Sequence, residues 1–420
     1  MPSRAGARTA AGAGVSWRAS RLFPQVTRLL RIGMEGQHSA WLAPVLLWLA
    51  SRVFSTALLV TAYAVATMRG WPFDASRDES SFAVFSGWWD AWFYRGIATS
   101  GYPPTLPTDA AGHVAPNAWA FLPVFPMLVH VVMATGASFW IAGLVVATLA
   151  GLGATVLLYR LVCATGGPGR ARRGTALFVF GPTGFLLQVS YAESLFLLLL
   201  FAALLALVHE RYVLVTVLGV VAAFTRPGVL ALALAVAVHL VVRHVRACRG
   251  GPPFPWPARL AAVGAGLLLA AAGLAWPVVA AVVTGRPDAY LATEVSWWVG
   301  FVGRREFVPL TPWFVMAARW LGPAGVVLVV AMFAAAAVFL TRRSVRAVGA
   351  DVLAFVVSYG LYLVAVFLPQ QSLPRLLMPM APLLGSDAFV RTRRRTLAWL
   401  VVGASLQPVA IVFLWLLGYP

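Results

Sequence analysis

Residues 41–68 read WLAPVLLWLASRVFSTALLVTAYAVATM, an apolar stretch that contains a single charged residue, Arg52. As a helix, a stretch of this length spans the hydrocarbon core of a bilayer, and it is too long for the apolar core of a signal peptide. Residues 1–40 before it carry several arginines against one acid, Glu35. Because basic segments stay in the cytoplasm, we expect an uncleaved signal anchor preceded by a cytoplasmic, arginine-rich N-terminal arm at 1–40.

The composition of the whole chain agrees with a membrane protein. Of its 420 residues, 61% are hydrophobic and 11% are charged, which leaves too few polar side chains to cover a soluble domain. The net charge of +19 comes from arginine alone, without any nucleic-acid-binding motif, so we expect a bilayer and no nucleic acid as partner. The arginine bias is typical of a GC-rich genome and favours a bacterial plasma membrane as the location.

Apolar stretches alternate with arginine-rich turns along the rest of the chain. Together with the first span they predict about eleven transmembrane helices in one multi-span domain over 41–420. The turns RARR at 170–173 and RHVRACR at 243–249 then face the cytoplasm. Cys163 and Cys248 lie near such cytoplasmic ends, where we expect no disulfide. The further predicted spans are 138–163, 175–190, 192–209, 211–225, 226–244, 258–284, 322–341, 350–368, 373–390 and 396–418.

Two long segments, 69–137 and 285–320, face outward in this topology. The first contains AWAFLPVFPMLVHVVMATG at 118–136, which is apolar but interrupted by Pro123 and Pro126. If this stretch crossed the membrane, the arginines that follow would lie outside, so we expect an interfacial or re-entrant helix instead. The predicted fold class is an all-α polytopic membrane protein whose large first outer loop contains interfacial helices.

Polar residues gather at one face in this topology. Because a polar side chain in lipid costs several kcal/mol, such places are informative. Their convergence from distant parts of the chain is typical of a single extracytoplasmic site. The converging segments are WWDAWFYRGIATSGYPP at 88–104, SYAESLF at 190–196, AAFTRPGVL at 222–230, RPDAYLATEVSWW at 286–298 and LPQQSLPRLLMP at 368–379.

The charged residues of these segments also have purely structural interpretations. Arg226 and Arg375 can snorkel to lipid headgroups. Glu193 can begin a helix, where the macrodipole favours an acid, and Asp90 can be an ordinary loop acid. The tryptophan-rich stretches are first of all typical of the membrane interface. The sequence has no HExxH or DxD pattern, so we expect no metal site.

As a set, the same residues suit sugar transfer from a lipid phosphate. The carboxylate of Asp90 can take the proton of a hydroxyl nucleophile, which typically contributes a factor of about 100 to 10,000. Arg226 and Arg375 can hold a phosphate at the membrane edge through charge-assisted hydrogen bonds. Aromatic rings can stack on sugar faces. The set therefore predicts glycosyl transfer to an acceptor hydroxyl at the outer face.

The ordered stretches WWDAWFYRGIATSGYP, AFLPVFPML, SYAESLF, FTRPG and QSLPRLLMPMAPLL resemble the PIG-V family of mannosyltransferases over most of the chain. The resemblance implies a GT-C glycosyltransferase fold, a polyprenyl- or dolichyl-phosphate mannose donor, an inverting mechanism and no cofactor or metal. It places Asp90 at the acid of the family's WD motif, as general base. It places Arg226 and Arg375 at basic positions, as ligands of the donor phosphate, and Glu193 at the acid of a Y-x-E-S-L-F stretch.

The acceptor and the sugar stay open at this point. After Arg226 the chain has Pro227 and Gly228, where eukaryotic members have a Ser-Asn-Gly-like run. We expect a polyprenyl-phosphate sugar as donor and a glycan or glycolipid as acceptor. The alternatives are a polytopic transporter or flippase of lipids or solutes, and a GT-C enzyme that uses another lipid-linked sugar. The side chains expected to contact substrate are Trp89, Trp92, Tyr94, Tyr191, Glu193 and Gln371.

Overall fold

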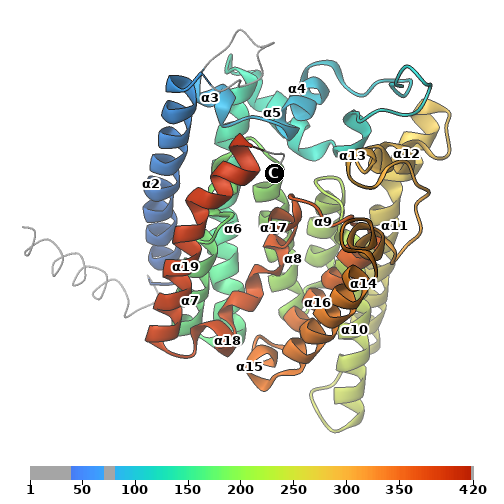
Figure 1. Ribbon diagram of the computed structural model, residues 1–420. Helices are drawn as coiled ribbons and strands as arrows, with labels where there is room; N and C mark the ends of the chain where they lie inside the picture. The colour runs from blue at the N-terminus through green and yellow to red at the C-terminus, as the bar shows by residue number, and fades with distance from the viewer. Residues whose placement is uncertain (1–38, 71–80, 418–420) are drawn as a thin grey trace, which may run out of the picture. The chain divides into compact units, whose positions relative to one another are not determined.

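The structure, a computed structural model, describes residues 39–70 and 81–417 (Figure 1). The chain divides into two units, Met1–Ala43 and Pro44–Pro420. Of the first unit only the beginning of one helix is described, so the predicted N-terminal arm lies almost entirely outside the described residues. The second unit contains all the features discussed below.

The prediction of an all-α fold is confirmed. Within 39–70 and 81–417 there is no β-sheet, and one isolated bridge pairs Thr108 with Val114. In chain order the elements are α2 (Ser39–Met68), α3 (Phe82–Phe85), α4 (Asp90–Ser100), η1 (Ala118–Ala120), α5 (Val124–Met133), α6 (Phe139–Gly166), α7 (Pro168–Val179), η2 (Gly184–Gln188), α8 (Glu193–Val208), α9 (Tyr212–Ala223), α10 (Val229–Cys248), α11 (Trp256–Thr284), α12 (Ala289–Ser296), α13 (Val299–Val302), α14 (Pro312–Thr341), α15 (Arg343–Arg346), α16 (Ala350–Val366), α17 (Leu373–Leu376), η3 (Met378–Gly385), α18 (Asp387–Val390), α19 (Arg393–Ile411) and the π-helical turn η4 (Val412–Leu416).

Six of the described helices are long and apolar enough to cross a bilayer, which indicates an integral membrane protein. They are α2, α6, α10, α11, α14 and the continuous stretch of α19 and η4. The apolar helices α5, α8, α9 and α16 are shorter, at 10–17 residues. Length and composition therefore support six of the roughly eleven crossings expected from the hydropathy pattern.

The segment predicted to lie at the interface forms η1 and α5. Helix α5 has ten residues, so it is about 15 Å long, half the thickness of a bilayer's hydrocarbon core. Figure 1 shows it at the upper end of the bundle, together with α3, α4, α12 and α13. The two predicted outer segments thus lie at the same end.

The predicted span at 175–190 is not one helix. Helix α7 begins earlier, with Pro168 in its first turn, and ends at Val179. The chain then passes through Pro182, which cannot donate a backbone hydrogen bond and disfavours helical geometry at the residue before it. The segment consequently continues as the 3-10 turn η2.

The predicted span at 373–390 is broken in the same way. It forms the short helix α17, the 3-10 segment η3 and the short helix α18. Three prolines, Pro374, Pro379 and Pro382, interrupt its backbone hydrogen bonding. Helix α14, in contrast, begins ten residues before the predicted 322–341 and is kinked at Gly322, whose φ is +58°.

The centre of the bundle is formed by α6 and α8. Both are apolar around their whole circumference, as expected for helices surrounded by other helices. Helix α7 packs against α6, α9 against α8, and α10 against both α11 and α16. Helix α14 is the least buried of the six long apolar helices, so it lies at the edge of the bundle.

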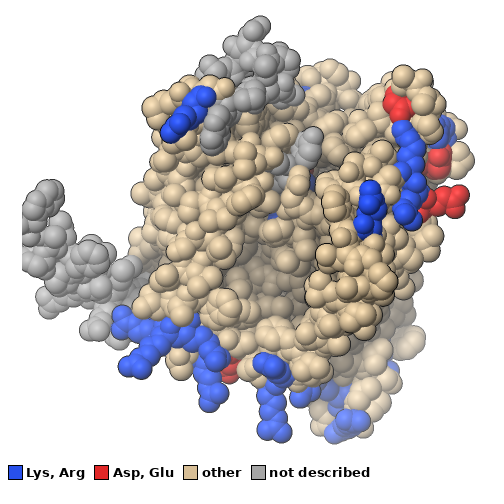
Figure 2. Space-filling view, viewed as in Figure 1, with Lys and Arg blue, Asp and Glu red and all other residues tan. Residues whose placement is uncertain are grey.

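Arginine side chains gather at the end of the bundle opposite α4 and α12. Figure 2 shows them along the lower edge, where Figure 1 places α15 and α18. Helix α15 contains Arg343 and Arg346, and α19 begins at Arg393. This is the distribution that the positive-inside rule produces when arginine-rich turns face the cytoplasm. Cys163 and Cys248 are both free thiols.

Arg52, the one charge within α2, is buried and hydrogen-bonded on both sides of its guanidinium group. Its Nη1 donates to Gln188 Oε1 at 2.9 Å and its Nη2 donates to the carbonyl oxygen of Gly184 at 2.9 Å. The guanidinium carbon lies 4.3 Å from the ring centre of Trp48. Arg52 therefore joins α2 to η2, and its position inside the span does not depend on reaching the headgroups.

We expect Arg52→Ala to lower the free energy of unfolding by about 2 kcal/mol, because buried acceptors lose charged donors. Arg69→Ala is the matched control, since Arg69 is exposed just beyond the end of α2, and its effect stays within about 0.5 kcal/mol. Unfolding of the purified protein by SDS titration measures both values. Equal stability of the two variants would contradict the role given to Arg52.

Candidate functional site

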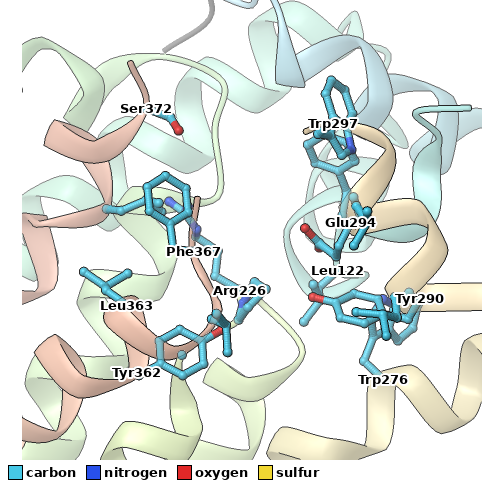
Figure 3. Close-up of a pocket in the computed structure, with 18 of the residues that line it drawn as sticks. Leu122, Arg226, Trp276, Tyr290, Glu294, Trp297, Tyr362, Leu363, Phe367 and Ser372 are labelled. Carbon is cyan, nitrogen blue, oxygen red and sulfur yellow. The ribbon is translucent and has the colours of Figure 1, made fainter. Parts of the chain in front are cut away.

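A cavity of about 690 Å³ lies between α4, α12 and the short helix α17. Its walls come from the beginning of α4, the segment before α10, and helices α11, α12, α16 and α17. Figure 3 shows side chains facing one another across it, with Arg226, Tyr362 and Phe367 on one side and Tyr290, Glu294 and Trp297 on the other. The cavity thus combines a few charged groups with extensive apolar and aromatic walls.

Asp90, which lines this cavity, is the first residue of α4 and follows a strained residue. Trp89 has φ +56° and ψ −111°, a conformation that a tryptophan adopts only when its surroundings hold it there. The indole Nε1 of Trp89 donates to the carbonyl oxygen of Trp415 at 3.0 Å, and Trp415 in turn donates to Phe85 at 2.9 Å. These contacts hold the backbone turn that directs Asp90 to the cavity.

Four charged side chains form one chain of ion pairs beside the cavity. Nη1 of Arg375 contacts Oδ2 of Asp90 and lies 3.4 Å from Oε1 of Glu193. Nη1 of Arg226 contacts the same oxygen of Glu193. The order is therefore Asp90, Arg375, Glu193, Arg226, and the structure brings these residues together from four separate parts of the sequence.

Burial and the ion pairs act in opposite directions on the protonation of these groups. Burial raises the pKa of Asp90 above its usual range, while the neighbouring guanidinium of Arg375 lowers it by a smaller amount. Burial lowers the pKa of Arg375, but the carboxylates of Asp90 and Glu193 more than offset this and raise it. Arg375 therefore stays charged, and Asp90 is a more basic carboxylate than one in water.

Glu193 lies behind the two arginines rather than in the cavity wall. It is the first residue of α8, where the helix macrodipole favours a carboxylate, and 3% of its side chain is exposed. One of its two carboxylate oxygens, Oε1, faces both Arg226 and Arg375. This geometry makes Glu193 the residue that orients the two guanidinium groups toward the cavity.

Gly228 fixes the direction in which Arg226 leaves α9. Its φ is +128°, and a Cβ atom at this position would lie 3.0 Å from the ring of Tyr359. Only glycine tolerates both the conformation and the close approach. The TRPG segment therefore turns sharply into α10 and leaves Arg226 at the cavity.

The remaining predicted substrate contacts divide into two groups. Tyr94 and Gln371 line the cavity. Trp92 packs edge-on against Trp140, at 4.7 Å between ring centres, and does not line it. Tyr191 is buried beneath Arg375, 5.6 Å from its guanidinium carbon, and its hydroxyl accepts a hydrogen bond from the backbone nitrogen of Asp90 at 3.3 Å. Neither Tyr191 nor Trp89 lines the cavity.

Several cavity residues received no role from the sequence. Glu294 on α12 points into the cavity from the wall opposite Arg226, and Trp297 lies one turn further on (Figure 3). Tyr359 and Tyr362 line it from α16. Sequence signals for these residues were present but weak: an acid four residues after a tyrosine, and two tyrosines three residues apart in an apolar span.

Carboxylates and imidazoles are not grouped for metal binding at this cavity or elsewhere in the described part of the chain. Across 39–70 and 81–417 no three His, Cys, Asp or Glu side chains lie close enough together to hold a metal ion. The polar chemistry of the site is therefore that of its carboxylates, guanidinium groups, hydroxyls and indoles.

The chain has no match among protein-family models, curated proteins or solved structures. Three kinds of side chain line the cavity: charged groups that include Asp90, Arg226 and Arg375, aromatic rings, and apolar side chains from α10, α11 and α16.

We expect Glu193→Gln to lower the free energy of unfolding by about 3 kcal/mol, because two buried guanidinium groups lose their shared carboxylate. The control is Asp288→Asn, since the ion pair of Asp288 with Arg286 is exposed, and its loss costs less than about 1 kcal/mol. SDS titration of the three proteins measures both differences. A loss for Glu193→Gln no larger than that of the control would show that Glu193 does not hold the arginines.

Proposed function

We propose that the protein is a membrane mannosyltransferase of the GT-C type. It transfers mannose from a polyprenyl phosphate to an acceptor hydroxyl, with inversion at the anomeric carbon and with Asp90 as the general base. The observation that carries the proposal is the cavity itself, which Asp90, Arg226 and Arg375 line together with apolar and aromatic side chains. The resemblance to the PIG-V family adds the sugar and the donor type.

The two arginines suit the phosphate of the donor. A guanidinium group binds phosphate oxygens through two parallel hydrogen bonds, and Arg226 and Arg375 reach the cavity from different segments. Arg226 also lies just before α10, whose amino-terminal end favours an anion. The singly charged phosphodiester of the donor at this place takes over hydrogen bonds that the guanidinium groups otherwise make to the internal carboxylates.

The apolar walls suit a polyprenyl chain. Leu230 of α10, Leu274 of α11, and Leu363 and Val366 of α16 line the cavity together with the charged residues. These residues belong to helices with extensive apolar outer surfaces, so the cavity walls and the surrounding lipid offer a chain similar environments. Such a combination of a few charged groups and apolar walls is typical of sites for amphiphilic ligands.

The reaction then follows from the positions of the charged groups. As the donor phosphate takes over hydrogen bonds of the arginines, the carboxylate of Asp90 is released to accept the proton of the acceptor hydroxyl. The acceptor oxygen forms a bond to the anomeric carbon, while the bond from that carbon to the phosphate oxygen breaks. The electron pair leaves with polyprenyl phosphate, whose negative charge the arginines stabilise.

A lipid flippase is the second candidate, because the broken segment α17–η3–α18 is a feature that transporters also use. Transporters place their binding groups near the bilayer midplane. Here Asp90 begins α4, a helix that Figure 1 shows at the upper end of the bundle. A GT-C enzyme with another lipid-linked sugar shares every feature of the cavity, and the choice of donor in the assay separates it from a mannosyltransferase.

Asp90→Asn is expected to lower the initial rate of mannose transfer about 100- to 10,000-fold, because the base is lost while the donor site remains. The assay uses purified protein in nanodiscs, radiolabelled polyprenyl-phosphate mannose and a bacterial membrane lipid extract as acceptor. Asp109→Asn is the control. Asp109 is an exposed acid in the same outer segment and forms an ion pair with Arg304, so we expect this variant to transfer mannose at the wild-type rate.

Equal rates of mannose transfer by wild type and Asp90→Asn, with both proteins folded, would show that Asp90 is not the base. The protein would still be a transferase. A wild-type protein that moves labelled lipid across liposomes without releasing polyprenyl phosphate would favour the flippase. Transfer from a polyprenyl-phosphate pentose in place of mannose would assign a different sugar.

The rate of transfer is expected to fall as the pH is lowered through the pKa of Asp90, because a general base must be ionised. Burial raises this pKa, so the fall begins above pH 4, the ordinary range of an aspartate. Arg375→Gln moves the fall to higher pH, since the guanidinium group lowers the pKa of Asp90. A profile of kcat/KM that is flat to pH 4 in wild type would contradict this assignment.

A further inference from the structure

The two sides of the cavity differ in their chemistry. One side, formed by the segment before α10 and by α17, presents the guanidinium groups of Arg226 and Arg375. The opposite side, formed mainly by α12, presents the carboxylate of Glu294 between aromatic rings (Figure 3). An anion that binds the first side is repelled by the second, so the two sides suit different parts of one ligand.

Glu294 differs from the other acids of the cavity in its partners. Asp90 and Glu193 each contact an arginine, whereas no arginine of the described residues forms an ion pair with Glu294. Its side-chain partner is the hydroxyl of Tyr290, one turn earlier on α12. A carboxylate in protein surroundings without a cation is unfavourable unless other donors satisfy its remaining lone pairs.

The aromatic neighbours of Glu294 define what those donors are. The rings of Trp276 and Trp297 line the cavity on the same side and offer it flat apolar surface. Trp276 is held in place because its Nε1 donates to the carbonyl oxygen of Trp119 at 2.9 Å. A carboxylate that accepts hydrogen bonds, flanked by flat apolar rings, matches a neutral polyhydroxylated ring, whose hydroxyls supply the donors.

We propose that the α12 side of the cavity is a sugar-binding subsite, in which Glu294 accepts hydrogen bonds from sugar hydroxyls and the rings of Trp276 and Trp297 offer apolar faces. The subsite deepens the proposed function and rests on it, because it assigns the donor's sugar to α12 and the donor's phosphate to the arginines. The segment 285–320 then supplies sugar recognition, whereas Asp90 and the arginines supply the chemistry.

The protonation of Glu294 gives the subsite a second signature. Burial raises the pKa of Glu294 to about 7, against smaller opposing effects of Tyr290 and Arg226. The ionisable and charged groups that face it are Tyr290 on its own helix, Arg226 before α10, Asp90 on α4 and Tyr362 on α16. Because the ionised carboxylate is the stronger acceptor, sugar binding is expected to strengthen as the pH rises through 7.

The test compares two ligands of equal charge, polyprenyl-phosphate mannose and methyl polyprenyl phosphate, which carries a methyl group in place of the sugar. Radiolabelled polyprenyl phosphate is bound to purified protein in nanodiscs and displaced by either of these unlabelled diesters. In wild type the mannosyl ligand binds about tenfold more tightly, the effect of one hydrogen bond to a charged group. In Glu294→Gln this ratio falls toward one, while the affinity for polyprenyl phosphate stays the same or increases.

Asp288→Asn is the matched control, since Asp288 is an exposed acid directly before α12 and pairs with Arg286. Asp288→Asn is expected to keep the wild-type ratio. The affinity of Glu294→Gln for polyprenyl phosphate, equal to or above that of wild type, shows that this variant is folded. Wild type is also expected to show a larger ratio at pH 8 than at pH 6, and Glu294→Gln to show no such dependence.

If Glu294→Gln kept the wild-type ratio of affinities for the two ligands, the proposed subsite would be contradicted. A loss of affinity of Glu294→Gln for both ligands alike would contradict it as well. Equal binding of the two ligands by wild type would also overturn it, while the phosphate site at the arginines would stand. If wild type bound neither ligand, both the proposed polyprenyl-phosphate donor and the sugar-binding subsite would be contradicted.

Discussion

The chain of ion pairs from Asp90 through Arg375 and Glu193 to Arg226 is the interaction on which the site depends. It joins the beginnings of α4 and α8, the short helix α17 and the segment before α10. Each member is at least largely buried, so removing one leaves a charge without a partner in surroundings of low dielectric. The network therefore fixes the outer segments on the bundle and keeps two guanidinium groups available at the cavity.

Interrupted helices make room for this network. Prolines and glycines interrupt the helices next to the ion pairs. Pro227 and Gly228 lie directly before α10, and Pro374 lies in α17. A continuous helix at either place would direct the arginine into lipid or into the next helix. The strained backbone of Trp89, which a hydrogen bond to Trp415 holds in place, directs Asp90 to the cavity. Local departures from regular structure thus position each charged group.

The helical class, the membrane location and the meeting of distant charged residues could be predicted from hydropathy and the unfavourable transfer of charge into lipid. The breaks at 175–190 and 373–390 were missed, because apolar runs look continuous even where prolines divide them. Which aromatic residues line the cavity was not predictable either, since Trp92 and Tyr94 lie on one helix and only tertiary packing decides which ring faces outward. Glu294 went unassigned because its lack of a cationic partner is visible only in three dimensions.

A cryo-EM structure of the Asp90→Asn protein in nanodiscs with polyprenyl-phosphate mannose tests the central claim most directly. The predicted result is phosphate density within hydrogen-bond distance of Arg226 and Arg375. The polyprenyl chain would run along the apolar walls of α10, α11 and α16, with the mannose between Asn at position 90 and Glu294. Density for the lipid elsewhere on the bundle, with the cavity occupied only by water, would contradict it.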